Sequence, residues 1–301
     1  MIENKRYLVV CRSRASTAWG GIMSATVEEA PPDEAEEALL AALIDDQSRA
    51  VEQVAAVADR LRGPEYILEA ARRLEALLEG QQQAFAAAAD AIETCVAADG
   101  LVYLFGSGHS HMLAEEGHYR AGGLACVVPI LASAIMLHEG ATASSQFERM
   151  SGVAEIVLSR YPIGPRDVVV VFSTSGVNAV PVEAAKLARA AGATVIAVTS
   201  QAYSAHVAAG RERLADVASI VLDNKAPPGD ACAQLTADGL NAGPISTVVG
   251  AALLNALLID ASARLLADGV EPPIYVSANM PGAAARNAAL VARYRSRNPH
   301  L

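Results

Sequence analysis

The sequence predicts an α/β fold, a doubly wound three-layer sandwich around a parallel sheet. After Asp99 and Gly100, short apolar runs alternate with segments whose apolar residues keep the spacing of a helix. The runs are continuous rather than alternating in polarity, as expected for strands that helices cover on both faces. We expect five strands, at residues 101–105, 124–130, 168–172, 194–199 and 217–222.

Helices are predicted before the first strand. Residues 1–32 keep no sustained period and end in two prolines, which predicts a disordered leader. Apolar residues at helical spacing, with acidic residues in the first turn, predict an amphipathic helical extension over residues 33–64. A glycine–proline pair breaks this helix, and residues 65–98 resume a helical pattern that continues past Gly80.

Further helices are predicted between and after the strands. We expect them at residues 110–121, 144–160, 179–191, 204–214, 243–268 and 282–297. The most apolar stretch, from Ile245 to Ile259, is shorter than the roughly 18–20 apolar residues that a membrane span requires. We therefore interpret it as a buried core helix of one globular domain over residues 65–301.

The net charge of the chain disfavours two classes of partner. Lys and Arg number 23 against 33 Asp and Glu, which gives a net charge of −10. Nucleic acids and anionic membranes both bind clustered cations, so we expect neither as a partner. A phosphate ligand would have to be bound by local geometry.

The cysteines and the N-terminus favour a cytoplasmic protein. The cysteines at positions 11, 95, 126 and 232 form no C-x-x-C pair and are typical of buried thiols in a reducing compartment. The apolar stretch from Tyr7 to Cys11 is too short for the core of a signal peptide.

Two turns rich in glycine and hydroxyl groups follow predicted strands. They are Gly106-Ser107-Gly108-His109-Ser110 and Ser173-Thr174-Ser175-Gly176-Val177-Asn178. Backbone N–H groups and hydroxyls at such turns donate to phosphate oxygens without needing a lysine. The alternative is a pair of hydroxyl-rich helix caps, since serine and threonine are favoured there for local reasons. Two such turns in one chain favour a phosphorylated small molecule as the ligand.

Nucleotide-binding patterns fit the chain less well. In the first turn, His111 stands where the dinucleotide fingerprint has its third glycine. After the second strand, Ala132 and Ser133 stand where a Rossmann site has an acidic residue for the ribose. The chain also lacks the G-x-x-x-x-G-K-[ST] run of a P-loop, so we expect no organic cofactor.

Together, these motifs resemble a known family. The two turns are similar to the phosphosugar-binding turns of the SIS (sugar isomerase) domain family. The order GSGHSHM, EEGHYRAGG, SxFERxxG, STSGVN, NAVPVE, PPGDA and PPIYVSAN resembles a bacterial subgroup with a single SIS domain. The resemblance spans residues 65–301. It implies a five-stranded parallel sheet, a phosphorylated sugar as ligand, and a homodimer or homotetramer.

The resemblance also implies where the sugar phosphate binds. The residues that would hold it are Ser107, Gly108, His109, Ser110, Ser173, Thr174, Ser175 and Asn178. Asn178 stands where the family pattern has a threonine, and its amide can still donate. The family includes isomerases, etherases, dehydratases and non-catalytic sensors. It therefore implies either an enzyme acting on an (N-acetyl)hexosamine 6-phosphate or a sugar-phosphate sensor.

An enzyme of this kind needs an acid–base group. Isomerisation and β-elimination both begin when a base, usually a carboxylate or histidine, removes the proton on C2 of the open-chain sugar. Our catalytic candidates are Glu116, His118 and Glu148; in spacing, Glu148 resembles an acidic position of the etherase branch. Arg120 stands where other branches have a glutamate. The alternatives are a solvated polar helix face and an ion pair of Glu148 with Arg149 or Arg120.

A metal site is a further alternative. The potential ligands are His109, His111, Glu115 and His118, of which His111 and Glu115 lie one helical turn apart. Some heptose-phosphate isomerases of the family hold zinc with a histidine and a glutamate four residues apart. In this chain the pair has a different offset from the turn, so we expect no metal.

Overall fold

A computed structural model describes residues 45, 49 and 62–301, and residues 62–301 lie in one compact unit. The expected leader at 1–32 lies outside the described residues, as does nearly all of the expected extension at 33–64.

The centre of the fold is a parallel five-stranded sheet, which confirms the predicted fold class. Its strands are β1 (Val102–Gly106), β2 (Val127–Ile130), β3 (Val168–Phe172), β4 (Thr194–Thr199) and β5 (Ile220–Asp223), in the order β2-β1-β3-β4-β5. Every residue of β1, β2 and β3 is buried, as the continuous apolar runs predicted.

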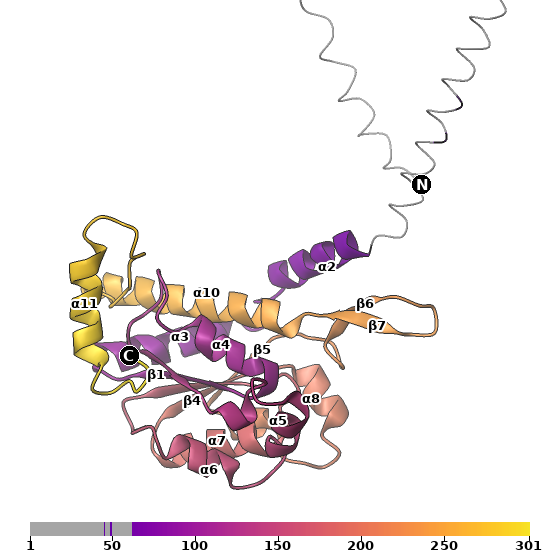
Figure 1. The fold of residues 1–301 in the computed structure, drawn as a ribbon, viewed down its shortest axis with the longest axis horizontal. Helices are drawn as coiled ribbons and strands as arrows, with labels where there is room; N and C mark the ends of the chain where they lie inside the picture. Colours follow the sequence, from indigo (N-terminus) through magenta and orange to yellow (C-terminus); the bar gives the residue numbers. More distant parts are fainter. Residues whose placement is uncertain (1–44, 46–48, 50–61) are drawn as a thin grey trace, which may run out of the picture. The chain divides into compact units, whose positions relative to one another are not determined.

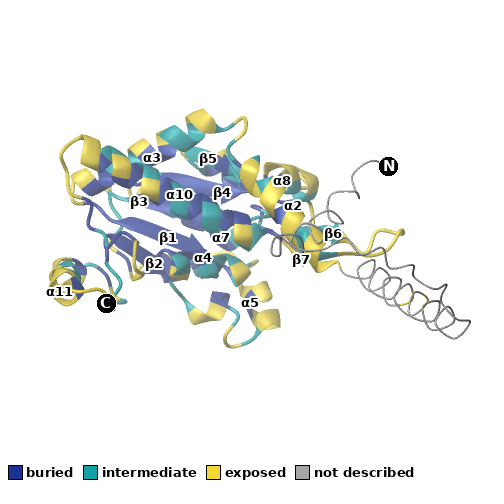
Figure 2. Cartoon of the chain, turned by 90° about the horizontal axis from the view of Figure 1, so that it is seen from above, coloured by how far each residue is buried: buried dark blue, intermediate teal, exposed yellow. Residues whose placement is uncertain are grey.

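Helices cover both faces of the sheet (Figure 1). On one face lie α3 (Gln82–Ala97), α4 (His111–Glu116) and the long α10 (Ser246–Ala267), with α3 packed along α10. On the other face, α6 (Val153–Leu158) packs on α7 (Ala179–Ala190) beside α9 (Leu214–Val217). Figure 2 shows the buried sheet beneath α3 and α10.

The helix α10 is the core helix that the sequence predicted. Among the described residues, it is the one helix whose length and composition would suit a membrane span. Its leucines instead pack into the core, where Leu253, Leu254 and Leu257 are at most 1% exposed.

Two predicted strands begin later than expected. The run at 124–130 becomes a strand only at Val127, because Leu124 forms an isolated antiparallel bridge with Ile274. The run at 217–222 becomes a strand only at Ile220, because Leu214–Val217 form α9.

Three predicted helices are each divided in two. Residues 65–98 form α2 (Gly63–Glu75) and α3, since the chain between them turns through Gly80, which has a φ of +74°. Residues 144–160 form α5 (Ala141–Phe147) and α6, and 204–214 is replaced by α8 (Gln201–Val207) and α9.

Several shorter elements complete the fold. The predicted tail helix is α11 (Ala283–Tyr294), and two 3₁₀ turns, η1 (Gly108–Ser110) and η2 (Ser133–Ile135), follow β1 and β2. An antiparallel hairpin, β6 (Ala231–Gln234) with β7 (Asn241–Pro244), precedes α10 and was not predicted.

Candidate functional site

The two predicted turns lie side by side at the carboxyl edge of the sheet. In the register of β1 and β3, Gly106 pairs with Phe172, the residue that ends β3. Ser107 and Ser173 therefore leave adjacent strands at the same level, where neighbouring strands are about 4.8 Å apart. Residues that are 66 positions apart in sequence, such as these two serines, thus begin one continuous polar edge. In open α/β sheets this edge is the usual ligand site.

The first turn is tightly folded. Ser107 is buried, and its carbonyl accepts a hydrogen bond from the backbone N–H of Ser110 at 3.0 Å. Gly106 has no room for a side chain, because a Cβ there would lie 2.3 Å from the carbonyl oxygen of Ser110. Within this turn His109 is exposed, whereas Gly108 and Ser110 are half-buried.

The second turn is held by hydrogen bonds within itself and to the residues that follow β4 and β5. The Ser173 hydroxyl accepts from the Gly176 N–H at 3.2 Å, and the Thr174 carbonyl accepts from the Ser200 N–H at 3.0 Å. The Thr174 hydroxyl accepts from the side-chain amide of Asn224 at 3.3 Å. Ser175 and Asn178 are half-buried, and Asn178 stands at the start of α7 without capping it through its side chain.

Glu148 contacts the first turn and the helix that follows the second turn. Its carboxylate accepts a hydrogen bond from the Ser107 hydroxyl at 2.8 Å, in the first turn. Its backbone carbonyl accepts a hydrogen bond at 3.1 Å from the N–H of Val180, the second residue of α7. The alternative ion pair with Arg149 is not formed, because the guanidinium of Arg149 binds Ser145 instead. Of the three catalytic candidates, Glu148 is thus placed among the predicted binding residues.

Glu116 and His118 are placed elsewhere. The Glu116 carboxylate pairs with Arg120 and accepts from the Asn255 side chain of α10 at 3.0 Å. His118 lies near the start of β2 with its ring 6.3 Å from that of His300, and burial lowers its pKa. The structure thus does not bring these two candidates to Glu148, and their catalytic role stays a prediction.

Two polar residues near the turns were missed by the sequence analysis. Asn224 directly follows β5, so the rule that ligands bind at strand carboxyl ends would have indicated it. Ser144 lies one helical turn before Glu148 on α5 and is 1% exposed. Its hydroxyl has no hydrogen-bond partner among the described residues, and nothing in its sequence context indicated this.

A cavity of about 360 Å³ adjoins the second turn. Asn178 lines it together with three basic side chains, Arg149, Lys186 and Arg211, and with the acidic groups of Glu183 and Glu212. Lys186 and Glu212 form an ion pair across it. The cavity brings basic groups beside the turn in a chain whose net charge is −10.

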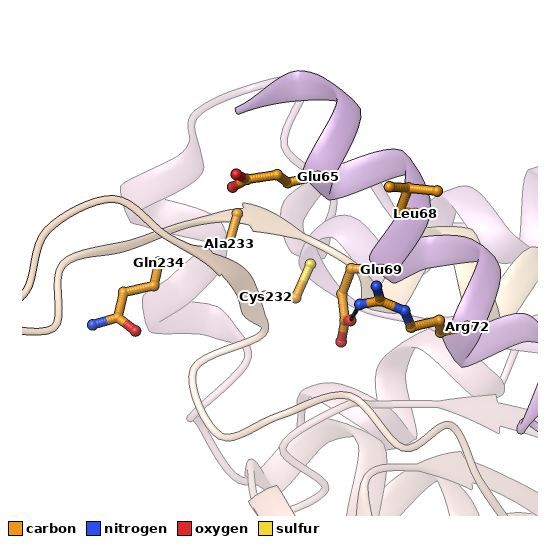
Figure 3. A pocket seen from close by; sticks show the side chains of 7 residues that line it. All are labelled: Glu65, Leu68, Glu69, Arg72, Cys232, Ala233 and Gln234. Carbon is orange, nitrogen blue, oxygen red and sulfur yellow. Dashed lines mark hydrogen bonds and ion pairs between the residues drawn. The ribbon is translucent and has the colours of Figure 1, made fainter. Parts of the chain in front are cut away.

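A second cavity, of about 310 Å³, lies between α2 and β6 (Figure 3). Its walls include Leu68, Cys232 and Ala233, and an ion pair of Arg72 with Glu69 borders it. None of the predicted site residues lines this cavity, so it is separate from the carboxyl edge of the sheet.

The described cysteines are free thiols. Cys95, Cys126 and Cys232 form no disulfide, and burial raises the pKa of Cys95 and of Cys126 to about 12. At neutral pH these two thiols stay protonated, which makes them poor nucleophiles.

The chain is similar to several known proteins. Residues 65–200 match the family model described as the SIS domain. A UPF0309 protein of Brucella canis is 52% identical over 236 residues, covering 78% of this chain and 97% of its own. A UPF0309 protein of Brucella anthropi is 54% identical over 229 residues, covering 76% and 94%. Among solved structures, phosphoheptose isomerase GmhA from Neisseria gonorrhoeae is 23% identical with a TM-score of 0.43, covering 71% of this chain and 99% of that one.

The match to the SIS-domain model begins in α2 and runs through β4, and thus includes both turns. The two relatives match more than three quarters of this chain, and their own chains are covered almost completely. The chain therefore belongs to the SIS-domain family, within its UPF0309 group.

Proposed function

We propose that this protein binds a phosphorylated sugar at the carboxyl edge of its sheet, an (N-acetyl)hexosamine 6-phosphate or a similar compound, as a cytoplasmic enzyme. The phosphate is held by hydroxyls and backbone N–H groups of the two turns, with Ser107 contributing its backbone N–H because its hydroxyl hydrogen is donated to Glu148. The contributing residues are Ser107, Gly108, His109, Ser110, Ser173, Thr174, Ser175 and Asn178.

The observation that carries the proposal is the position of Glu148. Its carboxylate lies at 2.8 Å from the hydroxyl of a phosphate-turn serine, Ser107. A sugar whose phosphate occupies the turns would place its carbon chain next to this carboxylate. A positioned carboxylate at that place can act as a general base toward the sugar.

The reaction that this base would start is enolisation. Glu148 takes the proton from C2 of the open-chain aldehyde, the C–H electron pair forms a C1–C2 double bond, and the carbonyl π pair moves onto O1 to give an enolate. For isomerisation, O1 takes up a proton from solvent, a proton returns to C1, and the hydroxyl or amine on C2 loses its proton, which gives the ketose or its 2-imine. Departure of the C3 substituent with its bonding electrons, from the same enolate, is the β-elimination.

A sugar-phosphate sensor is the second candidate function. It is favoured by the positions of Glu116 and His118, whose side chains contact Arg120, Asn255 and His300 instead of the turns. A single carboxylate at the turns would suffice to hydrogen-bond a sugar hydroxyl without any proton transfer.

Proton exchange in D2O distinguishes the enzyme from the sensor. The protein is incubated with N-acetylglucosamine 6-phosphate or glucosamine 6-phosphate, and the C2 proton signal is followed by NMR. We expect the signal to decay with the wild type. Glu148→Gln should slow the decay about 10²- to 10⁴-fold, the usual contribution of a general base. Glu155→Gln, which replaces an exposed carboxylate on α6, is the matched control and should exchange at the wild-type rate.

The thermal shift with the same sugars completes the test. Ligand binding raises the melting temperature whether or not chemistry follows. If sugar phosphates raise the melting temperature of the wild type but none exchanges its C2 proton, the proposed enzymatic function is overturned and the sensor is favoured. A panel that neither stabilises nor exchanges would overturn both.

A further inference from the structure

Three potential metal ligands meet beside the first turn. His111 begins α4, Glu115 follows one helical turn later, and His138 lies on the segment between η2 and α5. One ligand atom from each side chain can be chosen so that all three lie within 4.8 Å of one another. The two imidazole rings lie 5.1 Å apart between centroids and nearly perpendicular to each other, at 78°.

The hydrogen bonding of His111 leaves one of its nitrogens free to bind a metal. Its Nδ1 contacts the carbonyl oxygen of Gly108, and a carbonyl can only accept a hydrogen bond. Nδ1 therefore carries the hydrogen, and in the neutral ring Nε2 has the lone pair. A backbone carbonyl on the opposite nitrogen is the usual way in which proteins orient metal-binding histidines. The side chain is only 4% exposed, so packing also fixes the ring.

The distances within the cluster suit a tetrahedral ion. With metal–ligand bonds of about 2.0–2.1 Å, neighbouring ligand atoms of a tetrahedral zinc site lie about 3.3 Å apart. Nε2 of His111 and Oε2 of Glu115 are already 3.4 Å apart. His138 is exposed, and it needs to approach from at most 4.8 Å to about the same separation.

We propose that His111, Glu115 and His138 bind one divalent transition-metal ion, with Zn²⁺ as the expected ion. Two imidazoles and one carboxylate form the ligand set of zinc sites that keep a fourth position open for water or another small ligand. Sequence spacing does not group His138 with His111 and Glu115, because His138 belongs to a segment that only the fold brings to α4. The site does not rest on the proposed sugar chemistry.

The competing explanation is a simple ion pair. A protonated His111 would donate from Nε2 to Glu115, and the pair would need neither a metal nor His138. The two explanations differ in whether His138 contributes to metal affinity, because the ion pair leaves it without a role.

Metal titration of the full-length, untagged chain tests the site. The protein is freed of metal with a chelator and titrated with Zn²⁺ in competition with a chromophoric chelator. Visible absorption of bound Co²⁺ reports the coordination geometry. We expect one ion per chain and a tetrahedral Co²⁺ spectrum. Glu115→Gln and His138→Ala should each lower the affinity by about tenfold or more, since even the loss of an outer-shell partner has effects of that size.

His206→Ala is the matched control, because His206 is an exposed histidine on α8, outside the cluster. It should bind Zn²⁺ like the wild type. Circular dichroism confirms that each variant is folded, and His138→Ala changes only an exposed side chain. The proposal is overturned if the wild type fails to compete for Zn²⁺, or if both cluster variants bind as tightly as His206→Ala. No sugar phosphate is present, so this outcome is independent of the outcome for the sugar site.

Discussion

Glu116 and Glu148 are both half-buried carboxylates, and their partners decide what each can do. Glu116 has its charge balanced by Arg120 and an oxygen occupied by Asn255, which fixes α4 against α10. Glu148 accepts one hydrogen bond from a neutral hydroxyl, that of Ser107. A carboxylate without a cationic partner stays available as a proton acceptor, which is why the proposed base is Glu148.

The half-buried pair of His118 and His300 should make the protein less stable in mild acid. Burial lowers the pKa of His118, and burial together with the neighbouring His118 lowers the pKa of His300. Below the ordinary histidine pKa of about 6.5 the unfolded chain therefore binds more protons than the folded one, so stability falls as the pH falls. We expect a lower calorimetric melting temperature at about pH 5.5 than at about pH 7.5.

Substitution of His118 isolates its share of this effect. His118→Gln removes the titrating ring, and we expect a flatter dependence of melting temperature on pH. His206→Gln changes an exposed histidine outside the pair and should keep the wild-type dependence. A wild-type dependence in the His118 variant would show that other groups cause the acid sensitivity.

At the scale of single elements, the second turn depends on a glycine. Gly176 has a φ of +62°, and a Cβ there would lie 2.5 Å from the Thr199 hydroxyl oxygen. Gly229 also has a positive φ, +83°, but a Cβ there would meet nothing within 4 Å. Gly229→Ala should cost about 1 kcal/mol from backbone strain alone. Gly176→Ala should cost about 1–3 kcal/mol more, from the added steric clash.

Urea unfolding of the two alanine variants measures this difference. The Gly176 variant should also lose the thermal shift with sugar phosphates, because the clash displaces the turn, whereas the Gly229 variant should keep it. Equal free energies of unfolding for the two variants would contradict the prediction, because they would show that the Thr199 side chain moves aside without destabilising the fold.

The strands at the centre of the sheet were the best predicted elements. β3 and β4 match their predicted ranges because each is an unbroken aliphatic run between polar turns. The edge strands β2 and β5 were predicted too long, since periodicity cannot tell a strand from the short bridge or helix that precedes it. The prediction of one continuous helix at 65–98 was wrong, because the apolar spacing continues through Gly80 although the backbone turns there.

The candidate site was likewise predicted only in part. The two turns could be found because glycine and hydroxyl residues adjoin each other in sequence. The contacts with Ser107 and Asn255, by which Glu148 and Glu116 differ, could not be predicted, because these partners lie far from the two carboxylates in sequence. Contacts of that kind depend on the order of the strands and the packing of α10, which local patterns do not contain.

At the scale of the whole molecule, α2 presents an apolar face to solvent. Ile67 and Leu68 are 65% and 58% exposed, and Leu240, in the loop between β6 and β7, is 60% exposed. Leu68 also lines the cavity between α2 and β6 (Figure 3). Large exposed apolar side chains such as those of α2 are typical of a protein–protein interface. This face is our candidate for the contact in the expected homodimer or homotetramer.

Charged substitutions on α2 should therefore weaken self-association. The double variant Ile67→Glu with Leu68→Glu places two negative charges in the proposed contact. Association would then bury these charges against apolar groups, which is unfavourable. We expect the wild type to sediment as an oligomer and the double variant to shift toward the monomer in sedimentation velocity at micromolar concentration. Ile156→Glu replaces an isoleucine on α6 that is 73% exposed, and it should sediment like the wild type. A monomeric wild type, or an oligomer lost only with Ile156→Glu, would exclude α2 as the contact.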